Sequence, residues 1–158
     1  MLRDPKVVEH LNTQLTHELT AINQYFLHSR TLNHWGVTKL GQREYRESIE
    51  EMKHADRLIE RILVLDGLPN VQRLNQVMIG QTVEEVLRAD LALEETAVDD
   101  LRAGIAYCES VRDYVSRDLL AHILESEEES IDFITRQFDL IKQMGIERYI
   151  LLNSGSAE

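Results

Sequence analysis

Four long stretches of the chain carry apolar residues at the spacing of an amphipathic helix. They begin near residues 5, 39, 82 and 112, and the last runs to about residue 144. The first shows the pattern clearly, with apolar side chains every three or four positions at Val8, Leu11, Leu15, Leu19, Ile22 and Phe26. No run alternates apolar and polar residues as a half-buried strand would, and only two prolines occur in 158 residues. The pattern predicts an all-α protein.

Helix boundaries are marked by local signals. Asp4 before Pro5 is typical of a helix start, since its carboxylate can accept from a free N–H and proline needs no hydrogen bond there. Thr82 with Glu85 forms a capping box that opens the third helix. The second helix, which begins near residue 39, is expected to end at Gly67.

The connection between the second and third helices is long. Residues 67 to 81 are irregular, which favours a crossover along the molecule over a tight turn. Four long helices with one long middle connection predict a four-helix bundle over about residues 5–144, and residues 146–152 predict a short fifth helix. The length of 158 residues predicts a single domain over 1–158.

Composition narrows the possible partners. The formal net charge of -11 argues against nucleic acid and favours cations. The single cysteine, Cys108, is expected to be a buried apolar residue. We find neither a signal peptide nor a stretch long enough to span a membrane, and expect a cytoplasmic protein with no membrane partner.

Each of the four helices places one glutamate on its apolar stripe. Glu18, Glu94 and Glu127 lie in line with the leucines and isoleucines of their own helices, and Glu51 lies on the core-facing sector of the second helix with His54 one turn later. That sector also contains Glu44 and Glu47. A single glutamate of this kind usually keeps its carboxylate in solvent at the edge of a core, but one on every stripe favours a shared site.

Four buried carboxylates require positive charge. An isolated ionised carboxylate in an apolar interior costs several kcal/mol, so four together would unfold the bundle or become protonated. Two divalent metal ions would balance the charge, with the neutral imidazole of His54 as a nitrogen ligand. The alternative is a helical scaffold whose glutamates point to solvent.

The chain resembles the bacterioferritins, the haem-containing branch of the ferritins. The likeness covers nearly the whole chain and is carried by AINQYFLHSR, ESIEEMKHADRLIERIL, DGLP, DYVSRDLL and ESEEESID. It implies a ferritin-like bundle with a di-iron ferroxidase centre. The matching ligands are Glu18, Glu51, His54, Glu94 and Glu127, with Glu51 and Glu127 bridging. Glu18 and His54 would complete one iron, and Glu94 with a histidine would complete the other.

That second histidine is absent, because Ser130 stands at its position. A protonated serine hydroxyl is a weak ligand for Fe²⁺. His122 lies about 140° round the helix from Glu127 at about 100° per residue, and His10, His17, His28 and His34 lie off the stripe of the first helix. We therefore expect one normal and one weakened iron position, and a ferroxidase reaction with O₂ or peroxide that is slow or impaired. Arg46 replaces a histidine with which some relatives bind iron on the cavity wall.

The second helix has a further apolar face. It consists of Tyr45, Ile49, Met52, Asp56, Ile59 and Leu63. Two apolar faces predict two partners, the bundle itself and another subunit. A methionine inside a helix is usually core filler, but the resemblance implies that Met52 from each of two subunits is an axial ligand of haem b.

The resemblance thus implies an iron storage and detoxification protein in a cage of twenty-four subunits. It would hold ferric mineral and receive electrons from a redox partner for iron release. Two versions remain open, a homopolymer and a mixed cage in which a second type of bacterioferritin subunit oxidises Fe²⁺. A di-iron oxygenase is the rival from another class, although it would normally have two E-x-x-H pairs. The segment IERYILL at residues 146–152 would either plug a channel of the cage or cap the bundle.

Overall fold

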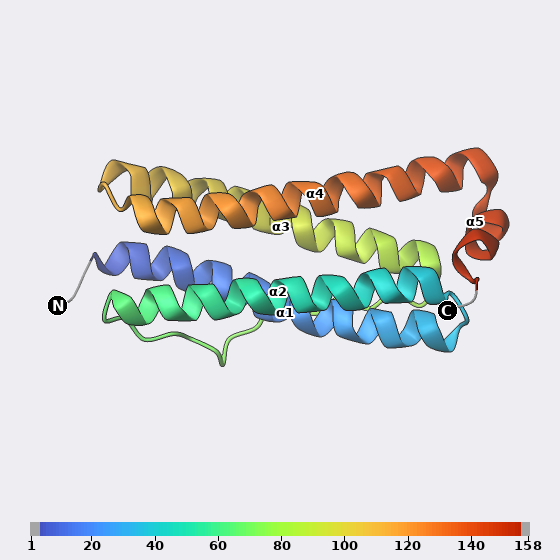
Figure 1. Cartoon of the computed structure of the whole chain (residues 1–158), viewed down its shortest axis with the longest axis horizontal. Coiled ribbons are helices and arrows are strands. Elements are labelled where there is room, and N and C mark those ends of the chain that lie inside the picture. The colour runs from blue at the N-terminus through green and yellow to red at the C-terminus, as the bar shows by residue number, and fades with distance from the viewer. Residues whose placement is uncertain (1–3, 156–158) are drawn as a thin grey trace.

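The described residues form five helices, and their order confirms the predicted all-α bundle (Figure 1). The computed structural model describes residues 4–155, so the extreme ends of the predicted 1–158 domain lie outside the described residues. The helices are α1 (Pro5–His34), α2 (Thr38–Val64), α3 (Val83–Ser110), α4 (Tyr114–Met144) and α5 (Ile146–Asn153). Helices α1 and α2 form one antiparallel pair and α3 and α4 the other, and the connection from α2 to α3 runs along the bundle (Figure 1). No helix in the described part of the chain combines the length and apolar character needed to cross a membrane.

The predicted helix starts are confirmed. The Asp4 carboxylate accepts from the Lys6 N–H at 2.8 Å, and Thr82 Oγ1 accepts from the Glu85 N–H at 3.1 Å. The predicted end of α2 was three residues too late, because α2 ends at Val64. Asp66, not Gly67, takes the left-handed conformation, with φ of 59°. Gly67 is instead needed for close packing, since a Cβ there would meet a methyl group of Val8 at 2.7 Å.

Two apolar clusters fill the bundle and leave a polar layer between them. One cluster contains Leu11, Leu58, Leu101 and Ile123, and the other contains Leu32, Leu40, Leu87 and Ile134. Each such side chain contributes roughly 1.5–3 kcal/mol when fully buried. Because the clusters hold the helices together on both sides, they keep the costly polar layer between them buried.

The short helix α5 closes one end of the bundle. Tyr149 is fully buried in the second apolar cluster, and its hydroxyl donates to Gln137 Oε1 at 2.8 Å. Leu151 and Leu152 on the same helix are exposed. Within one chain α5 therefore caps the bundle, while its exposed leucines leave an apolar surface for a further contact.

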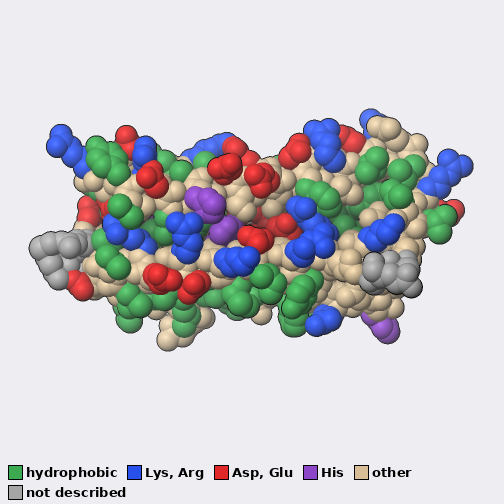
Figure 2. Space-filling model, viewed as in Figure 1, with side chains coloured by type: hydrophobic (Ala, Val, Ile, Leu, Met, Phe, Trp, Pro, Cys, Tyr) green, Lys and Arg blue, Asp and Glu red, His purple; other side chains and the backbone are tan. Residues whose placement is uncertain are grey.

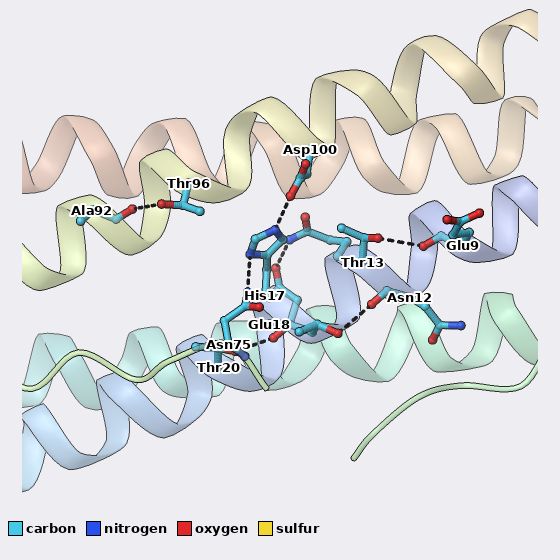
Figure 3. A network of polar contacts seen from close by, with 12 residues as sticks. Glu9, Asn12, Thr13, His17, Glu18, Thr20, Asn75, Ala92, Thr96 and Asp100 are labelled. Carbon is cyan, nitrogen blue, oxygen red and sulfur yellow. Dashed lines mark hydrogen bonds and ion pairs between the residues drawn. The ribbon is translucent and has the colours of Figure 1, made fainter. Parts of the chain in front are cut away.

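The crossover of residues 65–82 is bound to α1 by side chains. The acceptors are Asn12, Thr20, Gln24 and His28, and they accept from the N–H groups of residues 70, 75, 78 and 80 at 2.8–3.1 Å. His17 joins the same network, with its Nε2 2.7 Å from Asp100 Oδ2 of α3 and its Nδ1 3.3 Å from Asn75 Nδ2 (Figure 3). An irregular segment needs such partners for its backbone. The crossover thereby buries a second face of α1.

Candidate metal centre

Four potential metal ligands from three helices meet in the polar layer. One ligand atom each of Glu18 (α1), Glu51 and His54 (α2) and Glu127 (α4) lies within 4.8 Å of the others, and all four residues are buried. His54 Nδ1 is 3.2 Å from Glu18 Oε2 and 3.9 Å from Glu51 Oε1. We refer to these four residues as the ligand group. Three carboxylates and one imidazole are a donor set suited to iron, manganese or zinc.

The ligand group has little positive charge of its own. Within residues 4–155, no lysine or arginine forms an ion pair with its three carboxylates, and Glu18 Oε1 accepts only a neutral N–H from Gln14 at 2.7 Å. Burial, followed by the charge of Glu18, raises the pKa of Glu51 well above its ordinary value. Burial therefore favours the protonated form of Glu51, and a divalent cation that bound there would displace this proton.

Glu94 of α3 lies apart from the ligand group. Its Oε1 accepts from the Tyr25 hydroxyl at 2.6 Å, while its Oε2 is buried without a hydrogen-bond partner. Burial raises the pKa of Glu94 well above its ordinary value, and the hydrogen bond from Tyr25 opposes this shift. Of the five ligands expected from the resemblance, four are thus gathered and the fifth turns toward Tyr25, with one oxygen free to accept a cation.

Ser130 is buried and faces α2. Its hydroxyl donates to Glu47 Oε2 at 3.0 Å, and the other oxygen of Glu47 is 2.9 Å from Arg43 Nη2. The Arg43 guanidinium in turn lies 3.9 Å from the centre of the Phe133 ring. Glu47 therefore stands at the side of the site where the resemblance implies an imidazole.

His122 lies closer to the site than its position on the helix suggested. Its ring meets the ring of His54 edge to face, with centroids 6.0 Å apart. His122 is exposed and shares a surface pocket with His54, and the other lining residues are Glu50, Glu125, Ser126 and Glu129. Figure 2 shows histidine and acidic side chains gathered between α2 and α4 near the middle of this face. His122 thus lies at the outer side of His54, away from Ser130.

A second buried polar group joins α1, α2 and α3. His28 Nδ1 is 2.9 Å from Asp90 Oδ1 and 3.7 Å from Glu44 Oε1, and Gln24 Nε2 also donates to Asp90 Oδ1 at 2.9 Å. The Gly80 N–H donates to His28 Nε2 at 3.0 Å, so that nitrogen is unprotonated and Nδ1 carries the hydrogen. This tautomer makes His28 a donor to Asp90 and leaves it no free nitrogen for a metal.

One shared proton would satisfy the remaining atoms of this group. Glu44 Oε1 and Asp90 Oδ2 are both buried without a hydrogen-bond partner. Burial, followed by the charge of Asp90, raises the pKa of Glu44 well above its ordinary value. A protonated Glu44 that donates to Asp90 removes the like-charge repulsion between the two carboxylates. We call Glu44 and Asp90 the acid pair.

Sequence reasoning missed the acid pair and His28. Glu44 was placed on the core-facing sector of α2 but given no role, and Asp90 lies one turn before Glu94 on the stripe of α3. His28 lies off the apolar stripe of α1 but is fully buried, because the crossover covers that face. The four-residue spacing of Asp90 and Glu94 on one stripe could have indicated that Asp90 is buried. No local pattern could have indicated that the crossover covers His28.

The second apolar face of α2 is open to solvent. Tyr45, Met52 and Leu63 have 42%, 52% and 56% of their surface exposed. Figure 2 shows apolar side chains along the outer edge of the molecule near α2. An exposed thioether on an apolar face fits a haem held between two subunits, since it offers the iron a soft ligand and the macrocycle an apolar surface.

Comparison with known proteins decides the family. The Ferritin family, described as a ferritin-like domain, matches residues 8–144. A bacterioferritin of Brucella melitensis is 48% identical over 158 residues, which cover 100% of this chain and 98% of that protein. The chain belongs to the bacterioferritins. The bacterioferritins of Mycobacterium leprae and Streptomyces coelicolor are 48% and 49% identical, covering 94% and 95% of this chain and 94% and 90% of those proteins.

The match to the Ferritin family includes the whole candidate site. Positions 18 to 130 lie within the matched segment, so the ligand group, Glu94 and Ser130 all belong to the shared domain. The likeness to bacterioferritins inferred from the sequence is confirmed, as is the ferritin-like fold.

Proposed function

We propose that this bacterioferritin stores and detoxifies iron in the cytoplasm by binding Fe²⁺ at the ligand group and oxidising it there. The observation that supports this most is the convergence of three buried carboxylates and an imidazole without a pairing lysine or arginine among the described residues. Such a group is stable when a divalent cation takes the place of its protons. The overall charge of -11 would attract Fe²⁺ toward the protein.

Each ligand has a separate task in this proposal. Glu18 and His54 would complete the first iron position, and Glu94 would belong to the second. Glu51 of α2 and Glu127 of α4 would bridge the two irons, as the likeness to bacterioferritins implies. The pair of Fe²⁺ ions would supply the two electrons that reduce O₂ to peroxide, while the carboxyl groups release their protons on binding.

Iron uptake by a bridging-ligand variant tests the proposal. Glu51→Gln keeps the shape of the side chain but removes its charge, so iron retained after Fe²⁺ and air exposure should fall to a small fraction of the parent value. Glu60→Gln, at an exposed position of the same helix, is the matched control and should retain iron normally. Equal iron retention by all three proteins would overturn the proposed role of the ligand group.

Ser130 should slow the reaction. Its side chain is shorter than imidazole and its hydroxyl is already donated to Glu47. The second position therefore lacks a nitrogen ligand and should bind Fe²⁺ more weakly than the first. Ser130→His should raise the rate of Fe²⁺ oxidation in stopped-flow measurements at two Fe²⁺ per subunit, whereas equal rates would show that Ser130 is no impairment.

Met52 would hold haem b at the contact between two subunits. The thioether would be one axial ligand, the second coming from Met52 of the other copy, and the surrounding face of α2 would cover the ring. A thioether-ligated haem favours the ferrous state and supplies electron transfer to the mineral during iron release. The electrons would come from a redox partner.

The cage would contain twenty-four subunits around the ferric mineral. Two compositions follow from the weak second position, a homopolymer that oxidises iron slowly and a mixed cage in which a second bacterioferritin subunit oxidises Fe²⁺. Native mass spectrometry of the particle from its own cell separates them. A single subunit mass supports the homopolymer, and two masses support the mixed cage.

A further inference from the structure

We propose that Glu47 completes the second iron position, supplying a carboxylate oxygen where the imidazole is absent, and that Ser130 orients it. This inference rests on the proposed function and adds a residue that the family resemblance does not include. In this arrangement Ser130 acts as a hydrogen-bond donor to a ligand and binds no metal itself.

The positions of the four residues along two facing helices support this role. Helices α2 and α4 run antiparallel (Figure 1). Glu47 lies one turn before Glu51 on α2, and Ser130 lies one turn after Glu127 on α4. The contact between Glu47 and Ser130 therefore lies beside the bridging pair, on the side opposite the His54–His122 contact.

Glu47 lies one helical turn from the ligand group and beside a small cavity. Its side chain is 14% exposed and lines a small cavity beside Ser130, together with Tyr25 and Glu44. Glu47 lies outside the ligand group, so metal binding would require rotation about its side-chain torsion angles. Each carboxylate oxygen has two lone pairs, which allows Oε2 to accept from the Ser130 hydroxyl and bind a cation together. Donors that orient a ligand in this way are common at metal sites.

Charge balance is consistent with a fifth carboxylate. Arg43 pairs with Glu47 and is stacked on Phe133, so its charge stays beside this one glutamate. Two divalent ions and the Arg43 guanidinium together balance Glu18, Glu51, Glu94, Glu127 and Glu47. The second position would then have oxygen ligands only, which suits hard cations such as Mn²⁺ and Fe³⁺, while the first retains the imidazole of His54.

Anaerobic titration with Co²⁺, followed by calorimetry and visible absorption, tests this directly. The parent protein should bind two Co²⁺ per subunit. Glu47→Gln should weaken the second Co²⁺ by more than about 100-fold, and Ser130→Ala by about tenfold, since loss of an orienting donor typically costs 10–100-fold in affinity. The first Co²⁺, with its nitrogen ligand, should be unchanged in both variants.

Arg43→Met is the matched control. It removes the same ion pair as Glu47→Gln but keeps the carboxylate, so it should still bind two Co²⁺. Two tight Co²⁺ in Glu47→Gln, or only one in the parent protein, would overturn the role of Glu47 while leaving the ligand group intact. No Co²⁺ in the parent protein would overturn both this role and the proposed function. If Arg43→Met and Glu47→Gln both lose the second Co²⁺, the loss comes from the broken ion pair, and ligation by Glu47 is overturned.

Discussion

The hydroxyl of Tyr25 donates to Glu94 Oε1 at 2.6 Å, which joins α1 to α3 beside the ligand group. Both residues are buried, and Glu94 Oε2 has no hydrogen-bond partner. This hydrogen bond therefore supports a carboxyl group whose ionised form is strongly disfavoured by burial. A metal ion bound to Glu94 Oε2 would give this oxygen the partner that it lacks.

Replacing Tyr25 with phenylalanine should destabilise the metal-free protein. The change leaves both Glu94 oxygens unsatisfied, and a buried unsatisfied acceptor costs about 1–3 kcal/mol of unfolding free energy. Urea denaturation measures the loss, which should shrink when Co²⁺ is present because the metal then binds Glu94. Tyr45→Phe, at an exposed position, should change stability by less than about 0.5 kcal/mol. A metal-free Tyr25→Phe protein as stable as its parent would contradict this view of Glu94.

The acid pair predicts a pH-dependent stability. Glu44 keeps its proton in the folded chain but loses it in the unfolded chain above the ordinary pKa of 4.5. The unfolded state then binds fewer protons than the folded state, so the contribution of Glu44 to stability falls as the pH rises from 4.5 toward its raised pKa. Burial and then Asp90 raise this pKa most, Glu47 raises it further and Arg43 lowers it, while His28 Nδ1 lies 3.7 Å from Glu44 Oε1.

Glu44→Gln copies the protonated acid and should remove this loss. The difference between its unfolding free energy and that of the parent protein should increase as the pH rises above 4.5. Glu60→Gln should show no such trend, since Glu60 is exposed. If the difference in unfolding free energy between Glu44→Gln and the parent protein stays constant with pH, Glu44 is ionised in the folded chain.

These residues show how far sequence reasoning reaches. The starts of α1 and α3 were predictable, because Asp4 and Thr82 act on N–H groups two or three residues away. The helical period placed Glu18, Glu51 and Glu127 on core-facing stripes, since it depends only on 3.6 residues per turn. Whether these ligands bind iron remains a prediction.

The residues that sequence reasoning missed depend on contacts far along the chain. His28 is buried because residue 80 of the crossover reaches it, 52 positions away. The end of α2 was misplaced because Gly67 is required by packing against Val8 and not by a left-handed turn. Ser130 looked like a missing ligand, while its partner Glu47 is 83 positions distant. Such pairings follow from how the helices meet, which local patterns do not encode.

Gly80 should be essential for holding the crossover. A Cβ at this position would meet the backbone N of Val86 at 2.3 Å, so Gly80→Ala must shift the chain and disturb the hydrogen bond to His28. Overpacking of this kind costs about 1–3 kcal/mol. Hydrogen exchange should increase at residues 75–80 and at the start of α3, whereas the exposed neighbour Gln81→Ala should leave both protected. Unchanged exchange in Gly80→Ala would contradict the close packing.

Met52→Leu tests the predicted haem site. Leucine keeps the apolar face of α2 but cannot ligate iron, so the protein should assemble normally and lose the haem absorption bands. Size-exclusion chromatography with absorption spectra on the same fractions reports both properties. Ile59→Leu, on the same face, should keep its haem. Full haem retention by Met52→Leu would exclude ligation by this residue.

Anomalous diffraction at the iron edge, from crystals soaked anaerobically with Fe²⁺, tests most directly whether buried carboxylates of separate helices share metal ions. We expect one strong peak in contact with Glu18, Glu51, His54 and Glu127, and a second, weaker peak toward Glu94 and Glu47. Ordered side chains at the ligand group with no anomalous peak among them would contradict the account.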